Sequence, residues 1–275
     1  MQLAGRSIYG TAEERKKSAM QKPPQLLPSK LEDGQAPGIR YRIDGELVPV
    51  LHTWLDGTVP IYFEHHVVLW KDPPLNIGIR AMKGAFKRMV AGMPIFLTEA
   101  QGPGEIAFSR DGAGHLFPLH LMPGKAVLVR EHQFLAATGN LDYTFNRVKG
   151  VSNMLLGSTG FFVDRFSASH QEGVLWLHGY GNVFEKELAQ NEQIDIEPGG
   201  WVYRDETVRM DVQMFGLKTG IFGGGGKLTW NRFTGPGRLA IQTLFIAPLE
   251  GAESNAGAAA TGGVAGAIIG GLTRG

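Results

Sequence analysis

A short pattern of residues occurs three times along this chain, at intervals of 66 and then 67 residues. It reads IYFEHHVV from Ile61, VLVREHQF from Val127 and IDIEPGGW from Ile194. Apolar residues recur at the same alternate positions in each occurrence, as strands with one buried face require. Self-similarity at a fixed interval is the signature of a repeated structural unit. The chain is therefore predicted to contain about three repeats of one small β unit.

A second pattern recurs with the same spacing and adds a turn. FLTEAQGPGEIAF begins at Phe96, FVDRFSASHQEGVLWL at Phe162 and LTWNRFTGPGRLAI at Leu228. In the first and the last of these, a Gly-Pro-Gly triplet separates two strand-like runs, and tight turns select glycine and proline. We expect structural turns at Gly102, Pro103 and Gly104 and at Gly235, Pro236 and Gly237.

These patterns predict an all-β fold of three tandem repeats, each similar to a β-sandwich or a double-stranded β-helix. The expected divisions are an N-terminal extension with a short helix at 1–38, repeats at about 39–93, 94–159 and 160–226, closing strands at 227–247 and an Ala/Gly-rich tail at 248–275. The first repeat lacks an obvious second pattern, and the closing strands supply only that pattern. We therefore expect the closing strands to complete the first repeat, so that no sheet edge stays exposed.

One segment breaks the strand pattern. Residues 79–92, IRAMKGAFKRMVAG, place apolar residues at helical spacing beside basic ones, which predicts a short amphipathic helix ended by a glycine. Such a helix could contact an anionic membrane or an acidic partner, or its apolar side could pack on the β body while the charges face water. The candidate contact residues are Lys83, Phe86, Lys87, Arg88 and Met89.

Composition limits the classes of function. The chain has no cysteine, which excludes disulfide scaffolds, thiolate zinc sites and cysteine nucleophiles. The formal net charge is +1, so no strong field recruits nucleic acid. The N-terminus lacks the apolar core of a secretory signal, and no run of about 20 apolar residues could span a bilayer. We expect a cytoplasmic protein, with peripheral contact with the inner membrane as a further option.

The tail carries glycines at every fourth position. Gly262, Gly266 and Gly270 would suit close packing if the tail formed a helix against a partner. A flexible low-complexity tail and a membrane anchor are the alternatives.

The glycine run Gly223–Gly226 with Lys227 looks like a phosphate-binding loop but fails the test. That loop needs a glycine, four spacer residues and Gly-Lys before a serine or threonine that opens a helix. Here Ile221 takes the place of the first glycine, Leu228 follows the lysine, and a strand pattern comes next. We expect no nucleotide, and we assign no cofactor.

The histidines suggest a metal-dependent, cupin-like enzyme only weakly. Such a centre needs two histidines on one face of a strand, with a carboxylate and a third histidine. His65 and His66 are adjacent and would face opposite sides of a strand, and so would His115 and His120 if their strand is continuous. His132 falls at a turn of the repeat. No serine lies in a Gly-x-Ser-x-Gly elbow, so we assign neither a catalytic nor a metal site.

The residues at one position of the repeat bear on whether the chain binds nucleic acid. Arg165 and Arg232 share that position and could line a ring that binds RNA, but Glu99 occupies it in the remaining repeat. A carboxylate would interrupt a uniform basic track, so the sequence favours no nucleic-acid partner.

Three strips resemble one protein family. GAFKRMVAGMPIFLTEAQGPGEIAF, GKAVLVREHQFLAAT and GGGGKLTWNRFTGPGRLAIQT are similar to the hallmark strips of the mitochondrial biogenesis family named for altered inheritance of mitochondria. The resemblance covers about residues 39–246. It implies small β units like those of the trp RNA-binding attenuation protein, which assemble into rings, and three repeats per chain suggest a trimer with a quasi-ninefold arrangement.

The family has no settled catalytic activity, and its eukaryotic member is tied to the organisation of the inner membrane. We therefore expect a non-enzymatic, homo-oligomeric scaffold, or a module that binds an unidentified protein partner or a membrane complex. A metal-dependent cupin-like enzyme and a nucleic-acid-binding ring stay open as alternatives.

Overall fold

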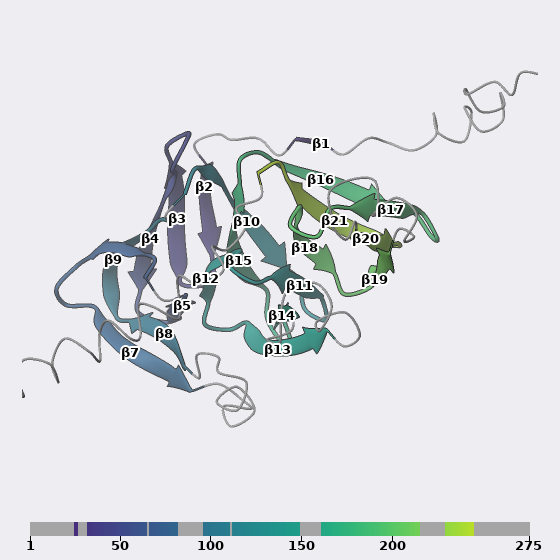
Figure 1. Cartoon of the computed structure of the whole chain (residues 1–275). Coiled ribbons are helices and arrows are strands. Elements are labelled where there is room, and N and C mark those ends of the chain that lie inside the picture. Colours follow the sequence, from purple (N-terminus) through teal and green to yellow (C-terminus); the bar gives the residue numbers. More distant parts are fainter. Residues whose placement is uncertain are drawn as a thin grey trace, which may run out of the picture. The chain divides into compact units, whose positions relative to one another are not determined.

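The computed structural model of the chain describes residues 25–26, 32–64, 66–81, 96–110, 112–148, 161–214 and 229–244, which all belong to one compact unit, Met1–Leu244 (Figure 1). All regular elements in these residues are strands, so the prediction of an all-β fold is confirmed there. The strands are β1 (Gln25–Leu26), β2 (Glu32–Ala36), β3 (Ile39–Asp44), β4 (Val50–Asp56), β5 (Ile61–Phe63), β6 (Val68–Lys71), β7 (Asn76–Ala81), β8 (Phe96–Gln101), β9 (Pro103–Phe108), β10 (Gly114–Leu121), β11 (Ala126–Arg130), β12 (Phe134–Thr138), β13 (Asp142–Val148), β14 (Phe161–Ser167), β15 (Gly173–Tyr180), β16 (Val183–Leu188), β17 (Gln193–Ile196), β18 (Trp201–Asp205), β19 (Arg209–Met214), β20 (Thr229–Thr234) and β21 (Gly237–Gln242).

The described strands form four antiparallel sheets. Their orders are β1-β16-β21-β18-β11-β14-β13, β10-β15-β12-β5-β8-β7, β2-β3-β4-β9-β6 and β17-β20-β19. Within them, β7 and β8, β13 and β14, and β19 and β20 pair as neighbours along the chain. The strip patterns of the sequence thus fall on paired strands.

Two pairings join strands that are far apart in sequence. β5 pairs with β12, and Phe63 lies opposite Ala136. β11 pairs with β18, and Val129 lies opposite Tyr203. We call these two pairings the first and the second junction. The first junction joins three strands to three in the six-stranded sheet, and the second joins four strands, including β1, to three in the seven-stranded sheet.

The closing strands do not complete the first repeat. β20 pairs with β17 and β19, and β21 pairs with β16 and β18, as Figure 1 also shows. The expectation that these strands return to the first repeat is therefore wrong. Their partners are the strands that come immediately before them in the chain, and pairing with near neighbours closes shorter loops at a lower cost in entropy.

The amphipathic helix does not begin at Ile79. Ile79 lies opposite Thr98 and Ala81 opposite Phe96 in the β7–β8 pair. Pairing with β8 satisfies the backbone of residues 79–81, and this tertiary contact overrides the helical spacing of the side chains. Residues 82–95, which carry the rest of that prediction, lie outside the described residues.

Part of the predicted N-terminal extension belongs to a sheet. β2 pairs with β3 as a hairpin, with Ala36 opposite Ile39. β1 pairs with β16, with Leu26 opposite Phe184. The short helix expected near the N-terminus and the tail from residue 248 lie outside the described residues.

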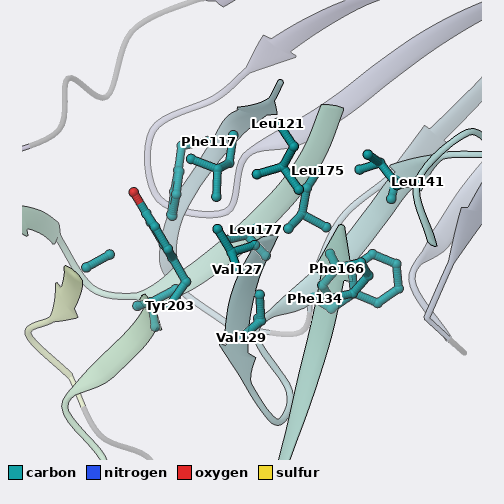
Figure 2. Packing of buried hydrophobic residues seen from close by; sticks show 14 of the residues in the cluster. Phe117, Leu121, Val127, Val129, Phe134, Leu141, Phe166, Leu175, Leu177 and Tyr203 are labelled. Atoms are coloured by element: carbon teal, nitrogen blue, oxygen red, sulfur yellow. The ribbon is translucent and has the colours of Figure 1, made fainter. Parts of the chain in front are cut away.

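The core is built from strands that are distant in sequence. Figure 2 shows one buried cluster, in which Phe134 of β12, Phe166 of β14 and Tyr203 of β18 contribute side chains. The rings of Phe134 and Phe166 are 4.7 Å apart between centroids, within the range at which aromatic pairs add stability. A second cluster contains Leu135 and Ala136 of β12 together with residues from β3 to β9. The two clusters therefore pack the strands across the first and second junctions.

Candidate functional site

The described surface carries an apolar patch on two strands at sheet edges. β6 is the last strand of the five-stranded sheet and β7 is the last strand of the six-stranded sheet. We use the term patch for the exposed apolar residues of these two strands, Val68, Leu69, Trp70, Ile77 and Ile79, which are 38%, 51%, 46%, 44% and 71% exposed. Val68, Trp70 and Ile77 line one groove. A sheet edge presents unpaired backbone groups, and a contiguous apolar patch marks a contact with another molecule. This combination is our candidate functional site.

A shallow groove of about 370 Å3 lies in the patch. Phe63, Val68, Trp70 and Ile77 supply apolar side chains to its lining, and Lys71 also lines it. A mostly apolar groove beside one cation suits a hydrophobic segment with an acidic group rather than a small polar substrate.

The indole of Trp70 is held in place by a polar cluster on the same face. Its Nε1 donates a hydrogen bond to Oε1 of Glu105 at 3.4 Å, and Nε1 of Trp54 donates to Oε2 of the same carboxylate at 3.1 Å. The ring of His52 lies 5.3 Å from the ring of Trp70. An aromatic side chain that is ordered in advance loses little entropy when a partner covers it.

Most of the predicted contact residues lie outside the described residues. These are Lys83, Phe86, Lys87, Arg88 and Met89, together with Gly262, Gly266 and Gly270 of the tail. The glycine run at 223–226 lies outside them as well.

At each of the two Gly-Pro-Gly triplets the chain passes from a strand of one sheet to a strand of another sheet. Gly102 separates β8 from β9 and has a φ of 117°, and Gly104 has a φ of 145°. Gly235 and Pro236 separate β20 from β21, the peptide bond between them is cis, and Gly237 has a φ of 136°. These φ values lie where side chains other than glycine are strained. Pro103 is the first residue of β9.

No metal centre is found among the residues that the structure describes. No three histidine, aspartate or glutamate side chains there converge in a way that could hold a metal ion. His66 and His132 occupy turns with the same left-handed φ of 67°. His115 is buried. His65 lies outside the described residues.

The two arginines considered for RNA binding lie in ion pairs. Arg165 donates to Glu206 at 2.7 Å, and Arg232 donates through two nitrogens to Asp195 at 2.7 Å. The hydrogen bonds from these guanidinium groups hold the pKa of each carboxyl below its usual range. Glu99, at the same repeat position, accepts from Arg80 at 3.0 Å. Each of these arginines thus has an acidic partner within the chain.

Sequence reasoning missed the apolar patch. The aligned strip ends at Val68, and the sequence analysis does not single out Leu69 or Trp70. The signal that could have revealed it is positional, because the first of the three predicted repeats has no repeat before it to cover this strand.

Comparisons with known proteins agree with the fold. The model of the family described as mitochondrial biogenesis AIM24 matches residues 41–244. No curated protein matches the chain. The crystal structure of protein SPYM3_0169 from Streptococcus pyogenes superimposes with a TM-score of 0.60 at 21% sequence identity, over 75% of this chain and 94% of that one. Within the described residues, the structure has no helix of the length and hydropathy that crossing a membrane requires.

Proposed function

The chain belongs to the mitochondrial biogenesis AIM24 family, and on that premise we propose that it is a non-enzymatic scaffold that assembles from several copies of itself and engages a membrane complex from the cytoplasmic side. The observation that carries the proposal is the apolar patch on β6 and β7. Its side chains offer hydrophobic contact and little chemistry, which suits assembly better than catalysis.

We propose three structural units of six strands each, β4–β9, β10–β15 and β16–β21. The strand pairing supports this division, because the pairings within the first proposed unit recur six strands later. β4 pairs with β9, β10 with β15 and β16 with β21. β6 pairs with β9, β12 with β15 and β18 with β21, and each of these three pairs has an irregularity in its register. Such recurrence is typical of repeat proteins.

The connections between three paired strands support contact with an anionic membrane. Residues 82–95, 149–160 and 215–228 join β7 to β8, β13 to β14 and β19 to β20, which are equivalent hairpins of the proposed units. Together these segments contain six lysines and arginines and no aspartate or glutamate, whereas the whole chain is nearly balanced at 27 basic and 26 acidic residues. Basic and apolar segments without acidic groups bind anionic lipid surfaces.

Sedimentation with lipid vesicles tests the membrane contact. Vesicles of phosphatidylcholine with about one third phosphatidylglycerol should retain the protein at low salt and release it at high salt. A chain with Lys83, Lys87 and Arg88 changed to Glu should bind weakly, while the control Lys125→Glu, at an exposed turn, should bind as the unchanged chain does. Equal retention on vesicles of phosphatidylcholine alone would contradict the proposal.

Multi-angle light scattering tests the scaffold. The full chain should elute as an oligomer at micromolar concentration, with a trimer as the expected state. A monomer of 29.9 kDa at every concentration would contradict the proposal.

A further inference from the structure

The two junctions inside the chain follow one rule. In each, three strands of one unit continue a sheet that three strands of the next unit began. The first junction gives β10-β15-β12 followed by β5-β8-β7, and the second gives β16-β21-β18 followed by β11-β14-β13. The strands that meet are β12 with β5 and β18 with β11.

Two half-sheets are left over by this rule. The strands β4-β9-β6 end at the free edge of β6, and the strands β17-β20-β19 begin at the free edge of β17. By position in the unit, β6 corresponds to β12 and β18, and β17 corresponds to β5 and β11. The two half-sheets are thus the two halves of a third junction that is not formed within the described residues.

The exposure of side chains on β6 also indicates a missing partner strand. Leu135 and Ala136 of β12 are fully buried, and so are Val202 and Tyr203 of β18. Their counterparts on β6 are Leu69 and Trp70, which are 51% and 46% exposed. The same strand is therefore a core strand in two units and a surface strand in the first.

The buried clusters repeat this asymmetry. Leu135 and Ala136 enter the cluster of the unit before theirs, and Val202 and Tyr203 likewise enter the cluster of the second unit. The cluster of the last unit, which includes Ile196 and Phe233, receives no such side chains. Leu69 and Trp70 of another chain would supply them.

We propose that β6 of one copy of the chain pairs with β17 of a second copy and forms the third junction between protomers. The proposal rests on the three-unit organisation proposed above. β6 pairs with β9 and β17 with β20 within the described residues of one chain, and the two belong to different sheets, so the partner is a second copy. The contact joins two different surfaces, so it repeats from copy to copy and forms a ring where the rotation between copies closes.

The internal junctions also fix the register. Phe63 lies opposite Ala136 and Val129 lies opposite Tyr203, and these two pairs are related by the repeat interval. The same interval places Ile196 opposite Trp70 of the second copy.

One neighbouring position in that register pairs opposite charges. Asp195 falls opposite Lys71, and opposite charges facing each other across antiparallel strands attract. Ile194 falls opposite Asp72. An exposed edge that receives a strand in this way gains main-chain hydrogen bonds along its length.

Disulfide trapping tests the register, because the chain has no native cysteine. Lys71→Cys and Asp195→Cys are placed on separate chains, mixed and oxidised with copper phenanthroline. A two-chain product should form in the mixture and not in either variant alone. As the control, Asp195→Cys is mixed with Val68→Cys, which lies three residues or about 10 Å along the strand and is too far for a disulfide. Ile194→Cys with Asp72→Cys is a second pair in register, for use if the first pair impairs folding.

The possible outcomes test the proposed junction and the proposed scaffold function separately. Cross-linking in the mixture, and a ladder of linked chains from one chain carrying both cysteines, support the junction. A disulfide within a single chain would show that the chain closes on itself, and cross-linking of Asp195→Cys alone would show a symmetric contact; either overturns the proposal. An oligomer that cross-links at neither pair overturns the junction and leaves the scaffold standing. A monomer in light scattering overturns both.

Discussion

Replacing a leucine by alanine should lower the stability of the single chain at one position and weaken assembly at the equivalent position of another proposed unit. Leu135 of β12 and Leu69 of β6 correspond in the proposed units, but Leu135 is fully buried and Leu69 is 51% exposed in the single chain. Leu135→Ala removes buried atoms and leaves a cavity, which costs about 2 to 5 kcal/mol of unfolding free energy. Leu69→Ala should cost the isolated chain less than about 1 kcal/mol.

The effect of Leu69→Ala should appear in assembly instead. Complete burial of a leucine contributes about 1.5 to 3 kcal/mol, and about half of Leu69 remains to be buried, so the change removes about 1 kcal/mol from each contact between protomers. The dissociation constant of that contact should rise about fivefold.

Two assays separate the effects. Urea unfolding at high dilution reports the stability of the single chain, and sedimentation velocity over a range of concentrations reports assembly. If Leu69→Ala destabilised the dilute chain as much as Leu135→Ala does, Leu69 would belong to the internal core. If it left the dissociation constant unchanged, β6 would have no part in assembly. Circular dichroism of both variants confirms that they fold.

Three further predictions concern the single chain. Gly104→Ala should lower the free energy of unfolding in urea by about 1 to 3 kcal/mol, because its φ is 145° and a Cβ would lie 3.2 Å from a neighbouring carboxylate oxygen. The control Gly78→Ala should be neutral or slightly stabilising, because a Cβ there would have no atom within 4 Å. Arg110→Met should cost about 1 to 3 kcal/mol, because the guanidinium is only 8% exposed and its removal takes a hydrogen-bond donor from the partly exposed carboxylate of Glu64. Hydrogen bonds from Arg232 depress the pKa of Asp195 below its ordinary 3.8. The contribution of the Asp195 carboxylate to stability should therefore be complete above about pH 5 and should be lost as the pH falls through the depressed pKa. Asp195→Asn should flatten this part of the curve of unfolding free energy against pH.

The strands were predictable wherever local chemistry decides them. Alternating apolar residues around Val127 and the Gly-Pro-Gly triplet at Gly102 needed no knowledge of partners, and both fall on or between strands. The helix expected from Ile79 failed at its start because pairing with β8 outweighs side-chain periodicity. Periodicity describes which face of a segment is apolar, but it does not say which strand will lie beside it.

Pairing partners and exposure were beyond the sequence for the same reason. The return of the closing strands to the first repeat is expected because that repeat lacks the second pattern and these strands supply only that pattern. A count of patterns does not show which strands pair. Trp70 is 46% exposed, although its counterparts Ala136 and Tyr203 in the proposed units are buried. In the proposed division no unit precedes the one that contains Trp70, and only the arrangement of the strands reveals this difference.

Hydrogen exchange on the two free edges tests the central claim most directly. Amide exchange of β6 and β17 is measured at a low protein concentration, where the chain is dissociated, and at a high concentration, where it is assembled. The account predicts that amides of both strands slow on assembly, while those of β12 and β18, which are paired on both sides within the chain, exchange equally slowly in both states. Fast exchange of β6 and β17 in the assembled protein, or full protection of both in the dilute chain, would contradict it.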